Sequence, residues 1–168
     1  MNRQKKEEEK KRQLQLLAIT PIDSFRDKYR FLSNFFPAIV EFDGRTFQST
    51  EAAYQSAKSL DPAIRELFVP LMANEAKKLG QEIQIRPDWD EVRDTIMLDL
   101  LKQKFYQNLA WQRLQATAPR PLVEGNNWHD TYWGVCKGCR KIGPHAPIGE
   151  NKLGRFLMLV RDGASYAF

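Results

Sequence analysis

Apolar residues recur at helical spacing along much of the chain, and stretches of strict alternation are short. The longest helical pattern begins after Arg86-Pro87-Asp88 and continues to about Tyr106. Its apolar members recur three and four residues apart, which is the spacing of one buried helix face. They are Val92, Ile96, Met97, Leu100, Leu101, Phe105 and Leu109. A similar pattern over 152–161 predicts a last helix that packs on the core.

Turn and capping residues predict the remaining elements. Asp43-Gly44 separates 39–42 from 45–48 and is the strongest short signal for a β-hairpin. Ser49 or Thr50 is expected to cap a helix over 51–60. Further helices are predicted over 62–69, 73–79 (ending at Gly80) and 109–116, and short strands over 18–25 and 122–124. The fold class is therefore mainly α (α+β), a compact single domain of helices with a small β-hairpin or sheet.

Length and charge divide the chain into a tail and one domain. The chain has 168 residues, of which 42% are hydrophobic and 28% charged, as is usual for a soluble domain. The net charge of +5 suggests anionic partners. Residues 1–13 hold six Lys or Arg against three Glu, so most of this excess lies there. We expect 1–13 to be a charged flexible tail or frayed helix, and 14–168 to be the domain.

Several classes of protein are not supported by the sequence. No apolar run approaches the ~18 residues of a membrane span, and the N-terminus is charged where a signal peptide is apolar. A cytoplasmic location without membrane contact is expected. The sequence also has no phosphate-binding loop with Gly-Lys, no dinucleotide-binding fingerprint and no nucleophile elbow.

One predicted helix carries a candidate catalytic group. Glu51, Gln55 and Lys58 are spaced so that they share one helix face. A carboxylate in the first turn faces the positive end of the helix dipole and stays ionised, which suits stabilisation of a developing cation. The alternative is an ordinary exposed helix, which also prefers acids at its start and Lys near its end.

A loop after the predicted strand 122–124 carries further candidates. The stretch EGNNWHDTYWG contains Asp130 and Trp133, and aromatic rings beside a carboxylate suit a planar base and its sugar. The alternative is that these rings fill a gap in the core. The following Gly-x-Asn-x-x-Gly at 149–154 either offers helix-start amides to a phosphate or is simply a capped helix start.

The two cysteines form one Cys-x-x-Cys motif, with His145 six residues after it. A structural zinc site normally has four ligands. Because Cys136, Cys139 and His145 leave that set incomplete, reduced cysteines without a metal are favoured over zinc.

Four segments in order resemble the NADAR, or YbiA-like, family. They are F-L-S-N-F-F (31–36), S-T-E-A-A-Y-Q-S-A-K (49–58), L-V-E-G-N-N-W-H-D-T-Y-W-G (122–134) and G-E-N-K-L-G-R-F-L-M-L-V-R (149–161). The resemblance covers residues 18–162. It implies a compact, largely helical fold and an enzyme that hydrolyses N-glycosidic bonds to ribose without metal or other cofactor. It also implies two substrate classes: phosphorylated ribosylamino-pyrimidine intermediates of riboflavin synthesis, and ADP-ribosylated guanine in nucleic acid.

The resemblance also implies roles for individual residues. The expected catalytic residues are Glu51, Asp130 and Lys58, and the expected substrate-binding residues are Trp89, Trp133, Asn34, Gln55, Asn151 and Arg161. The family often has His directly after the helix acid, where this chain has Ala52, and that departure bears on which substrate is chosen. The alternative function is a non-catalytic module that binds ADP-ribose or NAD.

Overall fold

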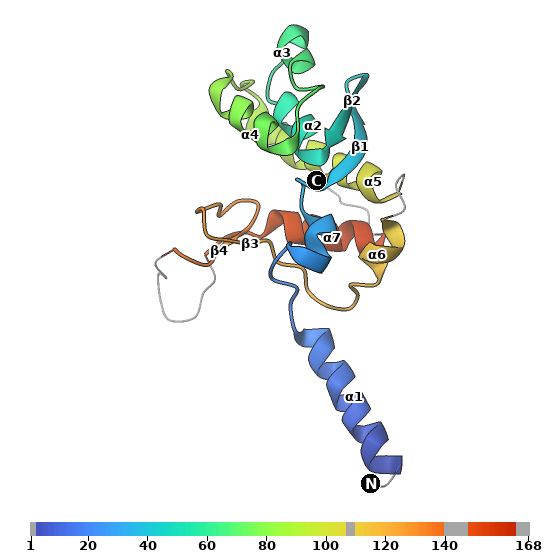
Figure 1. Ribbon diagram of the computed structural model, residues 1–168. Helices are drawn as coiled ribbons and strands as arrows, with labels where there is room; N and C mark the ends of the chain where they lie inside the picture. The colour runs from blue at the N-terminus through green and yellow to red at the C-terminus, as the bar shows by residue number, and fades with distance from the viewer. Residues whose placement is uncertain (1–2, 107–109, 140–147, 164–168) are drawn as a thin grey trace. The chain divides into compact units, whose positions relative to one another are not determined.

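Helices are the main elements of the computed structural model, which describes residues 3–106, 110–139 and 148–163 (Figure 1). The chain divides into two compact units. We call Arg26–Arg113 the central unit, and Met1–Phe25 with Leu114–Phe168 the terminal unit. The single domain expected from the sequence is thus made of two units, each described here by itself. No helix in the described ranges is both long and apolar enough to cross a membrane.

The central unit begins with a 3-10 helix, η1 (Asp27–Leu32), followed by an antiparallel hairpin of β1 (Pro37–Phe42) and β2 (Arg45–Ser49). Both residues of the connecting turn have positive φ, 51° at Asp43 and 71° at Gly44. That conformation matches the right-handed twist of the two strands. The predicted hairpin is therefore confirmed.

Four helices follow, and α2 is the most deeply placed of them. They are α2 (Thr50–Ser56), α3 (Pro62–Glu66), α4 (Ala73–Glu82) and α5 (Trp89–Tyr106). Ser49 caps α2, because its hydroxyl accepts a hydrogen bond from the Ala52 amide at 3.1 Å. Every residue of α2 is buried, and the helix packs against the hairpin, α4 and α5. It ends at Ser56 rather than at Leu60, so Lys58 lies in the turn that follows and not on the helix.

The prediction that Gly80 ends a helix was wrong, because α4 continues through it to Glu82. A Cβ atom at Gly80 would overlap the Gln55 side chain of α2. The glycine is thus a site of close approach between two helices rather than a stop signal.

The longest predicted helix is confirmed as α5, although its buried face begins later than expected. Met97, Leu100, Leu101 and Phe105 are buried, and Val92 and Ile96 are half-buried. The remaining predicted member of the face, Leu109, lies outside the described residues.

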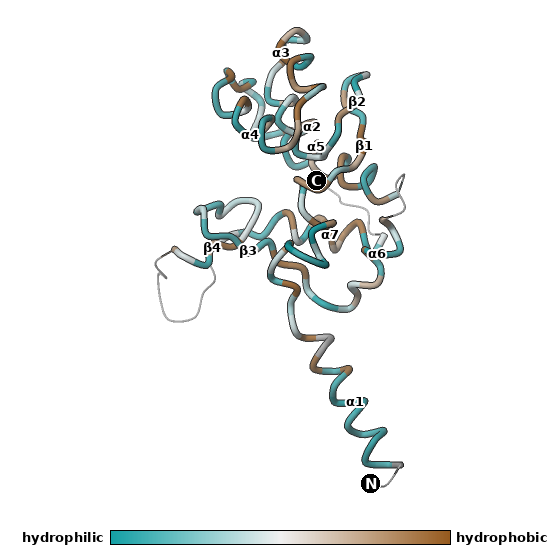
Figure 2. The backbone as a smooth tube through the Cα atoms, in the orientation of Figure 1, coloured by the Kyte–Doolittle hydropathy of each residue, from teal (hydrophilic) through white to brown (hydrophobic). Residues whose placement is uncertain are grey.

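The terminal unit includes the charged N-terminal segment, which forms the helix α1 (Arg3–Ile19). The structure therefore has a helix that runs past the expected boundary at residue 13. Side chains over 4–16 are exposed, and Figure 2 shows α1 coloured hydrophilic along most of its length. The strand predicted over 18–25 was wrong: only Ile22 pairs, in a single parallel bridge with Leu122. The predicted strand at 122–124 is limited to that same bridge.

The rest of the terminal unit consists of a two-stranded parallel pair and one long helix. The strands are β3 (Gly125–Asn126) and β4 (Val135–Cys136), and the helix is α7 (Lys152–Asp162), as predicted. Leu153, Phe156, Leu157 and Val160 form the buried face of α7. The short helix α6 (Trp111–Gln115) contains the boundary between the two units.

Candidate active site

The central unit places two of the predicted site residues in direct contact on α2. The Gln55 side chain donates a hydrogen bond from Nε2 to Oε1 of Glu51 at 2.8 Å. Each side chain is 5% exposed. The one-turn spacing of the two residues makes this contact possible, and their burial excludes most of the solvent from it. The Glu51 carboxylate is therefore held in a fixed orientation.

A third predicted residue, Asn34, joins this cluster through the main chain. The Glu51 amide donates a hydrogen bond to the Asn34 carbonyl at 3.1 Å. The Asn34 side chain is buried and its Nδ2 lies 3.4 Å from the Met97 sulfur. Its Oδ1 is buried and accepts no hydrogen bond from the described part of the chain. A buried oxygen of this kind is uncommon and indicates a place where an external donor would be accepted.

Lys58 lies beside this cluster, in the turn after α2. Its ammonium donates a hydrogen bond to the Gly80 carbonyl at 3.2 Å, and its own carbonyl accepts one from the Arg86 amide at 2.7 Å. Burial lowers the pKa of Lys58 below its usual range; the charge of Glu51 opposes this shift and that of Lys77 adds to it. A lysine in this environment is neutral over a wider pH range than an exposed one.

Trp89, a predicted substrate-binding residue, belongs to the packed interior of the central unit. It begins α5, is 8% exposed, and its ring centroid lies 5.0 Å from that of Tyr54 on α2. These contacts give the ring a packing role between two helices. Its predicted role in stacking a base remains a prediction.

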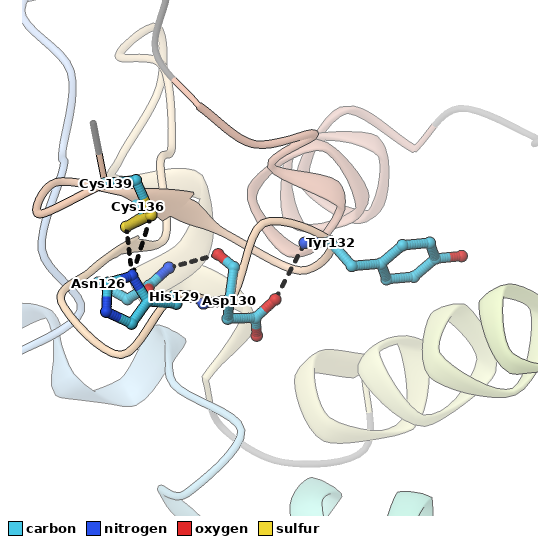
Figure 3. Close-up of a disulfide and its surroundings, with 6 residues drawn as sticks. All are labelled: Asn126, His129, Asp130, Tyr132, Cys136 and Cys139. Atoms are coloured by element: carbon cyan, nitrogen blue, oxygen red, sulfur yellow. Dashed lines mark hydrogen bonds between the residues drawn. A yellow bond between two sulfur atoms is a disulfide. The ribbon is translucent and has the colours of Figure 1, made fainter. Parts of the chain in front are cut away.

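The terminal unit holds Asp130, whose side chain organises its own loop. Oδ1 of Asp130 accepts hydrogen bonds from the amides of Tyr132 at 3.0 Å and Trp133 at 2.9 Å. The Asn126 side chain donates to the Asp130 carbonyl at 2.7 Å and accepts from its amide at 3.1 Å (Figure 3). Asn126 was not among the predicted site residues, although an amide four residues before Asp130 was visible in the sequence.

Trp133 is half-buried among other rings, as the core-filling alternative expects. Its ring meets Tyr132 at 5.1 Å and Phe156 at 6.0 Å between centroids, both edge to face. Lys152 also belongs to this group, since its ammonium donates to the Tyr132 hydroxyl at 2.8 Å and lies 4.2 Å from the centroid of that ring. Lys152 was not among the predicted site residues, because a Lys at a helix start carries no signal of its own.

Asn151 has hydrogen bonds that hold the terminal unit together. Its Oδ1 accepts from the Glu124 amide and its Nδ2 donates to the Leu122 carbonyl, both at 2.9 Å. Its backbone adopts the left-handed conformation, with φ at 52°. The side chain thus fastens the segment around Leu122 to the start of α7.

Arg161, at the other end of α7, also makes hydrogen bonds within the terminal unit. It is 8% exposed, and its guanidinium donates to the Arg120 carbonyl at 2.8 Å and to the Thr117 hydroxyl at 3.3 Å. The predicted binding roles of Asn151 and Arg161 remain predictions, and their observed contacts stabilise the unit.

The start of α7 is a capped helix start rather than an open anion site. The amides of Lys152 and Leu153 donate to the carbonyls of Tyr132 at 3.3 Å and Trp133 at 3.0 Å. The Asn151 amide donates to the Gly134 carbonyl at 3.3 Å. These amides are already paired with protein oxygens. The structure therefore favours the alternative that the 149–154 motif is a capped helix start.

The expectation of reduced cysteines was wrong, because Cys136 and Cys139 form a disulfide with their Cα atoms 5.5 Å apart. A Cys-x-x-Cys turn brings the two residues within the Cα separation that a disulfide needs. His145 lies outside the described residues.

The predicted site residues fall into two groups by unit. Glu51, Lys58, Gln55, Asn34 and Trp89 belong to the central unit, and within it Glu51, Gln55, Lys58 and Asn34 form one cluster. The terminal unit contains Asp130, Trp133, Asn151 and Arg161, of which Asp130 and Trp133 share a loop.

Comparisons with known proteins agree with this fold. The family model described as the NADAR domain matches residues 22–163. The N-glycosidase YbiA of Escherichia coli is 33% identical over 146 residues, which cover 83% of this chain and 84% of that protein. A riboflavin biosynthesis protein of Vibrio vulnificus is 33% identical over 141 residues, which are 81% of this chain but 36% of that protein.

A solved structure of a relative has a similar fold. The NMR structure of Escherichia coli YbiA superposes with a TM-score of 0.72 at 30% identity, covering 86% of this chain and 85% of that one. The mainly helical class with small sheets is thereby confirmed. The chain belongs to the NADAR family of YbiA-like N-glycosidases.

Proposed function

We propose that this N-glycosidase hydrolyses the bond between a ribose C1′ carbon and a nitrogen in a phosphorylated ribosylamine or an ADP-ribosylated compound. The observation that carries the proposal is the buried Glu51 carboxylate, which Gln55 orients and which lies beside a lysine of lowered pKa. Cleavage of such a bond develops positive charge at C1′ in an oxocarbenium-like transition state. A fixed carboxylate stabilises that charge more than mobile water does.

Lys58 has two possible tasks in this proposal. As a cation it binds a phosphate or hydroxyl of the substrate. As a neutral amine it attacks C1′ of the ring-opened sugar, where C1′ is an imine of the substrate nitrogen. The C1′–N bond to the substrate breaks and the substrate amine leaves, so that C1′ becomes an imine of Lys58, which water then hydrolyses to the sugar aldehyde and the free lysine. The lowered pKa of Lys58 supports the second task, because only the neutral amine is a nucleophile.

Asp130 and Trp133 remain in the proposal as groups that act on water and on the base. The Asp130 carboxylate would activate the attacking water. Hydrogen bonds from two backbone amides to Oδ1 hold its side chain in a fixed orientation. Trp133 would shield the base from solvent.

The unpaired oxygen of Asn34 supports a polar substrate. The side-chain oxygen Oδ1 belongs to the same residue as the carbonyl that accepts the hydrogen bond from the Glu51 amide. A hydroxyl of the ribose would satisfy it, since hydroxyls are donors that buried amide oxygens accept. We include Asn34 as a sugar-binding residue on this ground.

The substrate class is tested with a panel. Purified protein is incubated with a phosphorylated ribosylamino-pyrimidine, with ADP-ribosylated guanosine and with ADP-ribosylated guanine in DNA, and release of the free base or amine is measured. The name of the Vibrio relative supports the first compound. Binding of ADP-ribose without turnover of any compound would instead favour a non-catalytic module.

The role of Glu51 is tested by Glu51→Gln, which keeps the size of the side chain and an oxygen for Gln55. We expect the turnover rate to fall by about 10²–10⁴, as is typical when an acid–base or charge-stabilising group is lost. Glu82→Gln, an exposed acid on α4, is the matched control and should retain full activity. Melting curves of both variants separate lost chemistry from unfolding. Full activity of the Glu51 variant would remove this residue from the mechanism.

A further inference from the structure

Three side chains of types that can bind metals lie together in the terminal unit, and none of them is assigned to the reaction. Nδ1 of His129 is 3.1 Å from the Cys139 sulfur and 3.5 Å from the Cys136 sulfur. All three potential ligand atoms lie within 4.8 Å of one another. Figure 3 shows the imidazole pointing toward both sulfurs.

The loop around this cluster is built to hold the imidazole in place. The Asn126 side chain makes two hydrogen bonds to the backbone of Asp130, which closes the turn that contains His129. His129 has a φ of 65°, a conformation that is uncommon for a residue other than glycine and that tertiary contacts must hold.

The first of the two cysteines belongs to the strand pair that flanks this loop. Cys136 lies in β4 opposite Asn126 of β3, and its amide donates to the Ile148 carbonyl at 2.8 Å. The residue that fixes the histidine turn is therefore also the strand partner of the first cysteine. The β3–β4 strand pair and the turn that Asn126 closes therefore position the imidazole and the Cys136 sulfur close together.

The donor set has the chemistry of a zinc site. Two thiolates and one imidazole suit zinc, which binds sulfur at about 2.3 Å and nitrogen at about 2.0–2.1 Å in tetrahedral geometry. Those bond lengths require neighbouring ligand atoms to be roughly 3.5 Å apart. The observed nitrogen–sulfur distances of 3.1 and 3.5 Å are close to that spacing.

We propose that the reduced form of this loop binds one zinc ion through His129 Nδ1 and the thiolates of Cys136 and Cys139. Two molecules of a small thiol reduce the disulfide, giving two cysteine thiols and one oxidised thiol dimer. Each cysteine thiol then releases a proton to solvent as its sulfur binds the ion. Water completes the fourth position, as in zinc sites with three protein ligands.

The zinc ion would replace the disulfide as the cross-link between Cys136 and Cys139, and it would also connect these residues to His129, in the loop that carries Asp130. Both cross-links use the same sulfurs, so the chain holds one or the other. The proposal does not depend on the proposed reaction, because it rests on ligand atoms that the reaction does not use.

The test is a zinc titration of the full chain in two redox states. One sample is kept oxidised; the other is reduced with a small thiol, which is then removed under argon. Zinc sulfate is titrated against a chromophoric chelator, and cobalt(II) reports tetrahedral thiolate ligation by its visible absorption. We expect one zinc ion per chain in the reduced sample and none in the oxidised sample.

Variants identify the ligands. Cys136→Ser and Cys139→Ser should lose zinc binding, and His129→Ala should weaken it at least tenfold, since even outer-shell changes cost about 10–100-fold. Trp128→Phe, which changes the exposed neighbour of His129 without changing charge, should bind like the unaltered chain. Melting curves of the oxidised proteins check that the His129→Ala and Trp128→Phe variants are folded. Equal zinc affinity of the reduced and oxidised chains, or of His129→Ala and the unaltered chain, would overturn the proposal.

Discussion

At the scale of residues, the environment of a side chain decides what its chemistry can be. Glu51 and Lys58 are ordinary side chains for the two ends of an exposed helix. The structure buries the first under a hydrogen bond from Gln55 and lowers the pKa of the second. The contact between Gln55 and Glu51 follows from their one-turn spacing. The burial of Glu51 and the lowered pKa of Lys58 cannot be obtained from spacing, because both depend on segments that are distant in the sequence.

The lowered pKa of Lys58 predicts a pH dependence of the reaction. If the neutral amine attacks the sugar, the rate rises with pH through the pKa of Lys58 and levels off above it. Because that pKa is lowered, the rise occurs below the pH range of an ordinary lysine. The measurement is a pH–rate profile, together with borohydride trapping of the imine and mass spectrometry of the labelled residue.

Substitution separates the two tasks of Lys58. Lys58→Arg keeps the positive charge but has no neutral amine at accessible pH. We expect it to lose trapping and most of its turnover, whereas Lys78→Arg on the exposed side of α4 should behave like the unaltered chain. Full turnover of the Lys58→Arg variant would exclude attack by the neutral amine and leave binding of a phosphate or hydroxyl as the role of Lys58.

Asp130 combines a structural contact with a proposed catalytic one. Asp130→Asn keeps an oxygen that can accept from the Tyr132 and Trp133 amides, but it removes the negative charge. We therefore expect at least a tenfold loss of rate with little change in melting temperature, in line with losses of about 10²–10⁴ for general bases. A large drop in melting temperature with the rate of the folded fraction unchanged would assign the residue to the loop alone.

At the scale of elements, local signals placed the starts of helices better than their ends. The hydroxyl of Ser49 caps α2 as expected, and the carboxylate of Asp61 caps α3 at its predicted start, because capping involves residues only two or three positions apart. The passage of α4 through Gly80 follows instead from its close packing against α2.

The contact between α2 and α4 predicts the effect of Gly80→Ala. The added methyl would overlap the Gln55 oxygen, and overpacking of this kind costs about 1–3 kcal/mol. Better helix propensity offsets up to about 1 kcal/mol of this cost. We expect a lower free energy of unfolding, measured by denaturant titration, and a loss of turnover as Gln55 leaves Glu51.

Two controls test that explanation. Gln81→Ala, at the next and exposed position of α4, adds helix propensity without the overlap and should not destabilise the chain. In a Gln55→Ala background the space is free, so Gly80→Ala should no longer destabilise it. Independent, additive effects of the two substitutions would contradict the proposed overlap.

At the scale of the whole molecule, one family domain spans two compact units and the N-terminal helix lies before it. The family model begins at residue 22, after α1, and includes the whole central unit and part of the terminal unit. The charge of α1 therefore belongs to an exposed helix outside the family domain.

Removal of residues 1–13 tests the role of that charge. We expect turnover of a small nucleotide substrate to be unchanged, because the predicted catalytic residues all lie after residue 50. Binding to DNA should weaken and become less dependent on salt, since six basic residues are lost. The measurements are a rate assay and DNA titrations at several salt concentrations. A loss of turnover on the small substrate would assign the segment to the catalytic domain instead.

Features that depend on near neighbours could be predicted from the amino-acid sequence. The hairpin turn at Asp43-Gly44, the cap at Ser49 and the buried face of α7 all follow from residues a few positions apart, and four ordered motifs were enough to identify the family. Which groups meet across long separations follows only from the folded chain. The fold half-buries Lys58 and gives Asn151 and Arg161 their structural hydrogen bonds; over a shorter separation, it places His129 against the two cysteine sulfurs. These contacts depend on packing and backbone conformation far from each residue, which neither periodicity nor spacing encodes.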